Sequence, residues 1–442
     1  MIHKLLRLGL APLFFALLLS CGGGSSSPGG ISNAGGSAVT TTAAAGSGSS
    51  RNESPAGDGS TSASSGGSDN GSTSTAANGN GNGDSGVGSG GTGVSTADAG
   101  TSVGSVDGIG SIFVGDLRYD IDQAQLDLRD ATQLKIGLTV AVMGPVDAAF
   151  TSGTARQVAS MAQMRGVVDS VDVAGSSFQM LGSAISVDSN TVWADLAGLP
   201  AVSAGMQLQV WALPIGPGSL RATRIESQAL AATPLVSGVI SQLDVGGSTF
   251  QLGSLVIDYR LATLPAGGLA NGRIVRVSSA SPPAAGRLDA SAIDGWYALS
   301  SVKGAPVQLE GVMSNFASTA SFSLMGTPID ASAAQVTGGQ AQHLGNGVTV
   351  VASGTLSDAG VLVATKLKIR HVPGGGALPS FNLIGPITDF NSLADMTVKG
   401  QRLDASAATI VGTGQLANGV KVSVQGSQVV GGVLLATQLA FQ

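Results

Sequence analysis

Aspartate is the polar residue with the most regular spacing in this sequence. One aspartate follows a glycine by four to six residues in each of five related segments, at Asp120, Asp188, Asp258, Asp330 and Asp404. At the end of a strand, such a carboxylate can accept backbone N–H bonds in an Asx turn. Alternatively, it can supply an oxygen to a cation or to a sugar hydroxyl. Ca²⁺ takes about six to eight oxygens, and one carboxylate per segment does not gather them, so we expect the turn.

Histidine and cysteine offer little material for metal or nucleophilic chemistry. Beyond residue 21, the chain contains no cysteine and only two histidines, His343 and His371. A histidine metal site needs further ligands at suitable spacing. A Ser-His-Asp arrangement is spatial and leaves no fixed spacing, but no Gly-x-Ser-x-Gly segment between a strand and a helix supports one. We therefore expect no catalytic residue, no metal site, no cofactor and no enzyme.

A short basic stripe could bind phosphate. Lys366, Lys368 and Arg370 alternate with apolar residues, so they share one face of a strand. Nucleic-acid binding would need basic residues that continue across the repeats and alternate with aromatic ones. The stripe stops after one repeat, so we expect a solvated outer face and no nucleic-acid partner.

Tryptophan is the usual platform for sugar stacking. Trp193, Trp211 and Trp296 do not recur at one position of the repeat. For each of them we therefore expect packing in a core or at a barrel end rather than a saccharide-stacking platform.

The single cysteine lies at the end of an export leader, residues 1–21. A basic start is followed by an apolar run over 8–19 that is too short to span a bilayer. The segment Leu18-Leu19-Ser20-Cys21 resembles the bacterial lipobox. That resemblance implies acylation of Cys21, cleavage before it and membrane attachment through the lipid. Gly22 in place of aspartate implies the outer membrane under the enteric sorting rule. The alternative is an ordinary secretory signal with an incidental cysteine.

Residues 22–103 have the composition of a disordered linker. These 82 positions hold 23 Gly, 20 Ser, six charged residues and no aromatic residue. Such a segment buries too little apolar surface to offset its chain entropy. As a flexible chain it would reach roughly 50 Å, which is enough to hold a domain clear of a membrane.

The rest of the chain repeats. Glycine followed by small or β-branched residues recurs at Gly166, Gly238, Gly311 and Gly385, in steps of 72, 73 and 74 residues. Alternating apolar and polar runs of four to seven residues, separated by Gly, Asn, Asp and Ser, predict short half-buried strands. An Asn-Gly pair before several of these runs suits a tight turn. Short strands in units of about 70 residues favour small closed barrels, which have no exposed edges.

The expected fold is therefore all-β, with about five small OB-like β-barrel repeats in tandem after the linker. Copy three is the most degraded, because Pro282-Pro283 and Trp296-Tyr297 disturb its last strand. The copies have these expected bounds: 104–162 (copy one), 163–233 (copy two), 234–304 (copy three), 305–374 (copy four) and 381–442 (copy five).

One stretch of copy one carries a family resemblance. From Gly108 to Gly144 the chain reads GxGSIxVxxxxYDxDxA…LKxGxxVxVxG, which resembles the bacterial lipoprotein repeat of domain-of-unknown-function family 5666. The resemblance implies small β-barrels similar to the oligonucleotide/oligosaccharide-binding fold. It transfers no catalytic residue.

These observations point to a lipid-anchored lipoprotein of the outer membrane, facing the periplasm or the surface. Charged residues are only 11% of the chain and the net charge is −6, so a basic nucleic-acid binder is not expected. We expect a non-enzymatic binding or scaffolding module, with an envelope glycan or a protein as partner. A structural spacer or adhesin-like stalk is the alternative, and an uncharacterised enzyme is the third reading.

Overall fold

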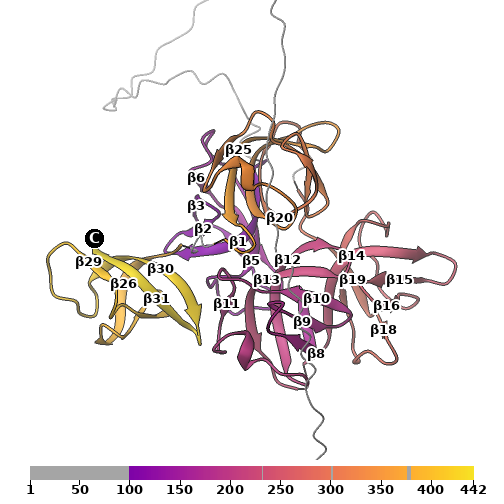
Figure 1. The fold of residues 1–442 in the computed structure, drawn as a ribbon, viewed down its shortest axis with the longest axis horizontal. Helices are drawn as coiled ribbons and strands as arrows, with labels where there is room; N and C mark the ends of the chain where they lie inside the picture. Colours follow the sequence, from indigo (N-terminus) through magenta and orange to yellow (C-terminus); the bar gives the residue numbers. More distant parts are fainter. Residues whose placement is uncertain (1–98, 231, 300–301, 376–379) are drawn as a thin grey trace, which may run out of the picture. The chain divides into compact units, whose positions relative to one another are not determined.

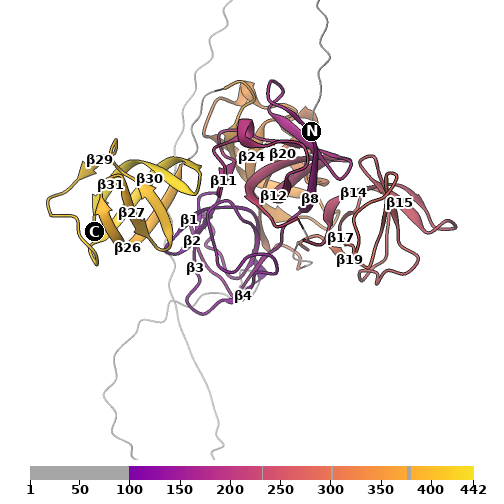
Figure 2. The same cartoon turned by 90° about the horizontal axis from the view of Figure 1, so that it is seen from below.

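The computed structural model describes residues 99–442, except 231, 300–301 and 376–379 (Figures 1 and 2). The leader, Cys21 and the expected linker up to residue 98 lie outside the described residues. The described chain is all-β, as predicted, with two short 3-10 helices, Leu199–Ala201 and Ala341–His343, and no α-helix. Within this part of the chain, no helix has the length and apolar character that crossing a membrane requires.

The strands follow the repeat. Copy one holds β1 (Thr101–Ile109), β2 (Ile112–Val114), β3 (Leu117–Asp120), β4 (Gln125–Asp127), β5 (Thr139–Met143), β6 (Ser152–Thr154) and β7 (Gln157–Ser160). Copy two holds β8 (Met164–Asp172), β9 (Ser177–Met180), β10 (Ser183–Ser186), β11 (Val192–Trp193), β12 (Gln207–Gly216) and β13 (Ser219–Ser227). Copy three holds β14 (Leu235–Asp244), β15 (Thr249–Leu252), β16 (Leu255–Asp258), β17 (Ile274–Ser278), β18 (Arg287–Asp289) and β19 (Ala292–Gly295).

The last two copies continue the series. Copy four holds β20 (Pro306–Ser318), β21 (Ser321–Leu324), β22 (Thr327–Asp330), β23 (Gln335–Thr337), β24 (Thr349–Leu356) and β25 (Leu362–His371). Copy five holds β26 (Phe381–Ser392), β27 (Asp395–Val398), β28 (Gln401–Asp404), β29 (Thr409–Val411), β30 (Lys421–Val430) and β31 (Val433–Phe441). Copy three lacks the long final strand of copies two, four and five, and has the short β18 and β19 instead, as its prolines predicted.

The expectation of separate OB-like barrels is wrong. Within copy two, β8, β9, β10, β13 and β12 pair in a ring, but the ring is not separate, because β8 also pairs with β14 of copy three. The hydrogen bonding does not stop at the limits of a copy. One sheet of 19 strands contains copies one, four and five, and one of 12 strands contains copies two and three. The arrangement is a β-solenoid of about 10 turns, not an array of independent barrels.

Strand β1 shows how the copies are joined. It begins at Thr101, three residues before the expected start of copy one, and its first eight residues are buried. Its first half pairs in parallel with β20, where Val103 is opposite Leu309. Its last residues pair in parallel with β26, where Gly108 is opposite Asn382. Through these pairings, β1 joins copy one to copies four and five.

Glycine makes the contact with β26 possible. A Cβ built on Gly108 would lie 2.4 Å from the Asn382 carbonyl oxygen, far inside van der Waals contact. The GxG pair of the sequence motif therefore allows two backbones to meet, which is a recognised use of glycine in strands.

The cores also cross the limits of the copies. Copies two and three share one apolar cluster, in which Phe178 and Phe250 are both about 1% exposed. Trp211 of copy two is fully buried in the core of copy one. Trp193, also of copy two, is buried in the shared core. The expectation of core packing is thus confirmed for these two tryptophans.

The Asn-Gly pairs do more than close a turn. The amide oxygens of Asn271, Asn346 and Asn418 accept the backbone N–H groups of Leu243, Phe316 and Phe390, at 3.0, 2.8 and 2.8 Å. The residue before each donor, Gln242, Asn315 or Asp389, has a positive φ near 50°. The asparagine side chain therefore stabilises a β-bulge in the first long strand of its copy.

Candidate binding site

The recurring aspartates form Asx turns, as predicted. Each carboxylate accepts the backbone N–H of the residue two positions later. The donors to Asp120, Asp188, Asp258, Asp330 and Asp404 are Asp122, Asn190, Arg260, Ser332 and Ser406, at 2.8–3.0 Å. Hydrogen bonds from Ser332 and Ser406 hold the pKa of Asp330 and of Asp404 below its usual value. These carboxylates do not converge, and the described residues contain no group of three or more potential metal-ligating side chains.

In copies two and three, the recurring aspartate also accepts hydrogen bonds from arginine side chains. Asp188 accepts two bonds from Arg221, at 2.7 and 3.1 Å. Burial raises the pKa of Asp188, but the charge and hydrogen bonds of Arg221 outweigh burial and lower it. Asp258 accepts from Arg260 and Arg287, and these hydrogen bonds lower its pKa.

The basic stripe of β25 is only partly solvated, because Lys366 and Lys368 are half-buried and the Arg370 side chain is largely buried. Lys366 donates to the carbonyl of Ala149, Lys368 donates to Asp116, and Arg370 donates to Asp107 at 2.6 Å. All three acceptors belong to copy one. The stripe is therefore a contact between copies, and its acceptors lie more than 200 residues away in the sequence.

Arg370 and Arg221 belong to a first charge cluster, which also contains Asp107, Glu310 and Asp188. Glu310 Oε2 accepts the Ser105 N–H at 2.8 Å, and its Oε1 lies 3.9 Å from Arg221. Asp107 and Glu310 are each only 2% exposed. Side chains from copies one, two and four thus meet in a buried site, where ion pairs hold geometry more than they add stability.

Asp107 is the least satisfied member of the first charge cluster. Its Oδ2 atom is buried and has no hydrogen-bond partner among the described residues. Burial and the nearby charge of Glu310 raise the pKa of Asp107 to about 6, against the opposing effect of Arg370 and Lys368. Of the two histidines beyond the leader, His371 lies at this cluster, with its Nε2 atom 3.9 Å from Asp188. His343 lies in an exposed 3-10 helix, away from this cluster.

A second charge cluster joins copies one, two and three. The carboxylate of Asp130 accepts from Arg165 at 2.5 Å and from Arg276 at 2.7 Å. The Asp130 side chain is 8% exposed. Asp294 extends the cluster to the surface through Arg276 and Arg129. No pattern within one repeat could show either cluster, because each needs three copies.

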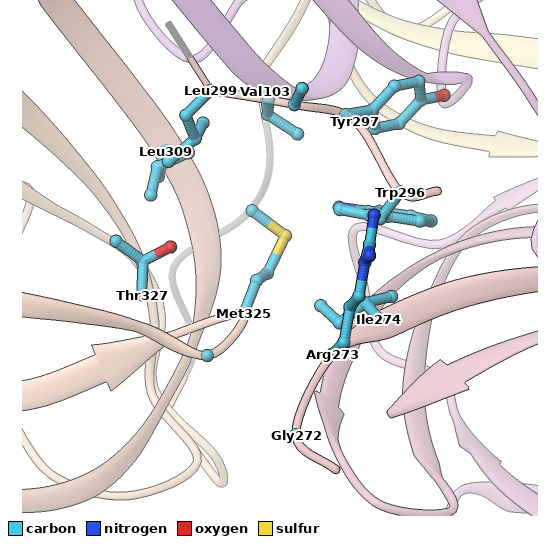
Figure 3. Close-up of a pocket in the computed structure, with 12 residues that line it drawn as sticks. Val103, Gly272, Arg273, Ile274, Trp296, Tyr297, Leu299, Leu309, Met325 and Thr327 are labelled. Atoms are coloured by element: carbon cyan, nitrogen blue, oxygen red, sulfur yellow. The ribbon is translucent and has the colours of Figure 1, made fainter. Parts of the chain in front are cut away.

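The third tryptophan packs at the edge of a core and also lines a pocket. Trp296 is half-buried, and its ring centroid lies 4.8 Å from that of Tyr297. The cavity has a volume of about 310 Å³ and is lined by β20, the β21–β22 turn and residues near β17. Figure 3 shows Met325 facing Trp296 across the opening, with the Arg273 side chain extending to the Trp296 ring.

Hydrogen bonds fix the orientation of Tyr297 and Arg273, two of the residues that line the pocket. The Tyr297 hydroxyl accepts from the Met161 N–H at 2.8 Å and donates to the Thr139 carbonyl at 3.0 Å. Arg273 donates to the Ala266 carbonyl at 2.8 Å, which fixes its guanidinium. An aromatic face beside fixed hydrogen-bonding groups is the usual composition of a small-molecule site.

Three segments of the chain match a known protein family. Three segments, 165–226, 310–368 and 384–440, match the family model described as Domain of unknown function (DUF5666). The chain carries three DUF5666 domains. They coincide with copies two, four and five, so the family resemblance is confirmed for these three copies, whereas the motif of copy one is not matched.

The matched DUF5666 domains are the copies that keep the long final strands β13, β25 and β31. Copy one and copy three, in which those strands are shortened or split, are not matched. A search of the curated proteins finds no match to the chain.

Proposed function

We propose that this DUF5666 repeat protein is a lipid-anchored module of the bacterial cell envelope that binds a hydroxyl-rich polymer without catalysing a reaction. The anchor would be Cys21, and the segment that follows it would connect the repeats to the outer membrane. The recurring carboxylates are already occupied in Asx turns and ion pairs, which favours a structural use of the polar residues over a catalytic one.

The observation that carries the proposal is the half-buried Trp296 in its pocket. A sugar ring packs its apolar face on an aromatic ring, while its hydroxyls bond to polar groups at the edge. Arg273 provides such groups beside the Trp296 ring, and Thr327 provides a hydroxyl across the pocket from it (Figure 3). The pocket favours a binding module over a spacer or stalk, since a spacer needs no aromatic ring open to solvent.

A pull-down with peptidoglycan and a glycan array tests this function. We expect the purified chain to be retained and Trp296→Ala to lose retention. Phe390→Ala is the matched control, because Phe390 is also a half-buried aromatic residue but lies in copy five. Retention that is absent, or that is equal in both variants, would count against the proposal.

A further inference from the structure

Four cationic side chains from three copies line a second cavity, of about 280 Å³. They are Lys135 from copy one, Arg224 from copy two, and Lys399 and Arg402 from copy five. Two amides, Gln133 and Gln401, complete its polar wall, and no carboxylate lines it. In a chain with net charge −6 and only 21 Lys and Arg residues, this is a marked local excess of positive charge.

Two of these four cations, Arg224 and Arg402, are paired with carboxylates, and within the described residues the two lysines are not. Arg224 is 5% exposed, donates to Glu226 at 2.6 Å and to the Ile136 carbonyl at 2.9 Å. Arg402 pairs with Asp395 at 3.2 Å. In the described part of the chain, the ammonium groups of Lys135 and Lys399 have no hydrogen-bond or ion-pair partner. Four cations thus face two nearby paired carboxylates, which leaves a net positive cavity.

Backbone contacts hold the walls of the cavity together. The N–H groups of Gly431 and Gly432 donate to the carbonyls of Leu196 and Trp193, at 2.9 and 3.0 Å. The Gln401 side chain donates to the Gly432 carbonyl at 2.8 Å. The β30–β31 turn of copy five is therefore fixed on copy two, and the copy-five cations are held opposite Arg224.

We propose that this cavity binds a phosphate group. Phosphate matches both donor types, since a guanidinium offers a planar fork and an ammonium a compact point charge. The free ammonium groups supply attraction that is not already neutralised, and partial burial weakens solvent screening. The site lies apart from the Trp296 pocket and does not depend on it, so either proposal can fail alone.

Titration calorimetry with inorganic phosphate at low salt is the direct test. We expect saturable binding at one site per chain, weakened at least tenfold in the Lys135→Gln/Lys399→Gln double variant. Lys421→Gln is the matched control, because Lys421 is an exposed lysine of copy five outside the cavity, and it should bind like the wild type. Lys399→Arg should keep binding, and an unchanged melting temperature shows that each variant is folded.

A second arm identifies the source of the phosphate. Vesicles of phosphatidylcholine with phosphatidic acid are compared with vesicles of phosphatidylcholine alone by cosedimentation. Binding of free phosphate without the acidic vesicles assigns a soluble or saccharide-borne phosphate, whereas lysine-dependent binding of both includes a lipid headgroup. The absence of phosphate binding, or phosphate binding that survives in the double variant, would overturn the proposal.

Discussion

Asp107 should make the stability of this protein fall as the pH rises towards neutrality. Its pKa is raised from 3.8 to about 6 in the folded chain, so the folded state binds a proton more tightly than the unfolded state. The resulting stabilisation is complete below the unfolded pKa and is lost as the pH passes the folded pKa. This direction is opposite to that of a normal salt-bridged aspartate.

The magnitude follows from the size of the shift. One pKa unit corresponds to 1.36 kcal/mol, so the full effect is about 3 kcal/mol. Between pH 5 and pH 7.5, where only part of that shift is traversed, the linkage relation gives about 1.4 kcal/mol. Asp107→Asn removes the titration while keeping the shape of the side chain, so this difference should disappear in the variant.

Urea unfolding followed by tryptophan fluorescence measures the effect, because Trp211 is fully buried. Wild type and Asp107→Asn are compared at pH 5 and pH 7.5. The variant will be less stable overall, since Arg370 loses its charged partner, but the comparison uses only the change with pH. An equal pH dependence in the two proteins would refute the assignment.

Three further predictions concern the contacts between copies and the Asx turns. Asp130→Ala removes the buried carboxylate shared by Arg165 and Arg276 and should cost about 3–5 kcal/mol in urea unfolding, whereas the control Asp358→Ala, which breaks the exposed ion pair with Lys303, should cost at most about 1 kcal/mol. Gly108→Ala should separate copy five from β1 and increase proteolysis there, whereas Gly345→Ala, with open space around its Cβ, should not. Asp188→Asn should reduce the loss of stability on acidification, because the lowered pKa of Asp188 stabilises the fold only above its ordinary 3.8.

Features that depend only on residues within one repeat could be predicted from the sequence. Alternation gave the all-β class, and the spacing of glycine and asparagine gave the turns. All five aspartates lie in the predicted Asx turns, because an Asx turn is a local arrangement of adjacent residues. The weak last strand of copy three could likewise be read from its prolines.

Contacts between copies could not be predicted in this way. The bonds from Lys366, Lys368 and Arg370 to copy one were missed because their acceptors are separated from them by more than 200 residues. Separate barrels were wrong for the same reason, since nothing in a single repeat shows that β1 pairs with both β20 and β26. The Trp296 pocket also needs three copies, so the lack of a repeated tryptophan position was a poor guide to it.

The most direct test of the proposed function concerns Cys21. Wild type and Cys21→Ser are expressed in a bacterial host and analysed by intact mass and membrane fractionation. We predict a wild-type chain that begins at an acylated Cys21 and sediments with the outer membrane, and a variant that is unmodified and soluble. Equal mass and equal fractionation of the two proteins would contradict a lipid-anchored envelope module.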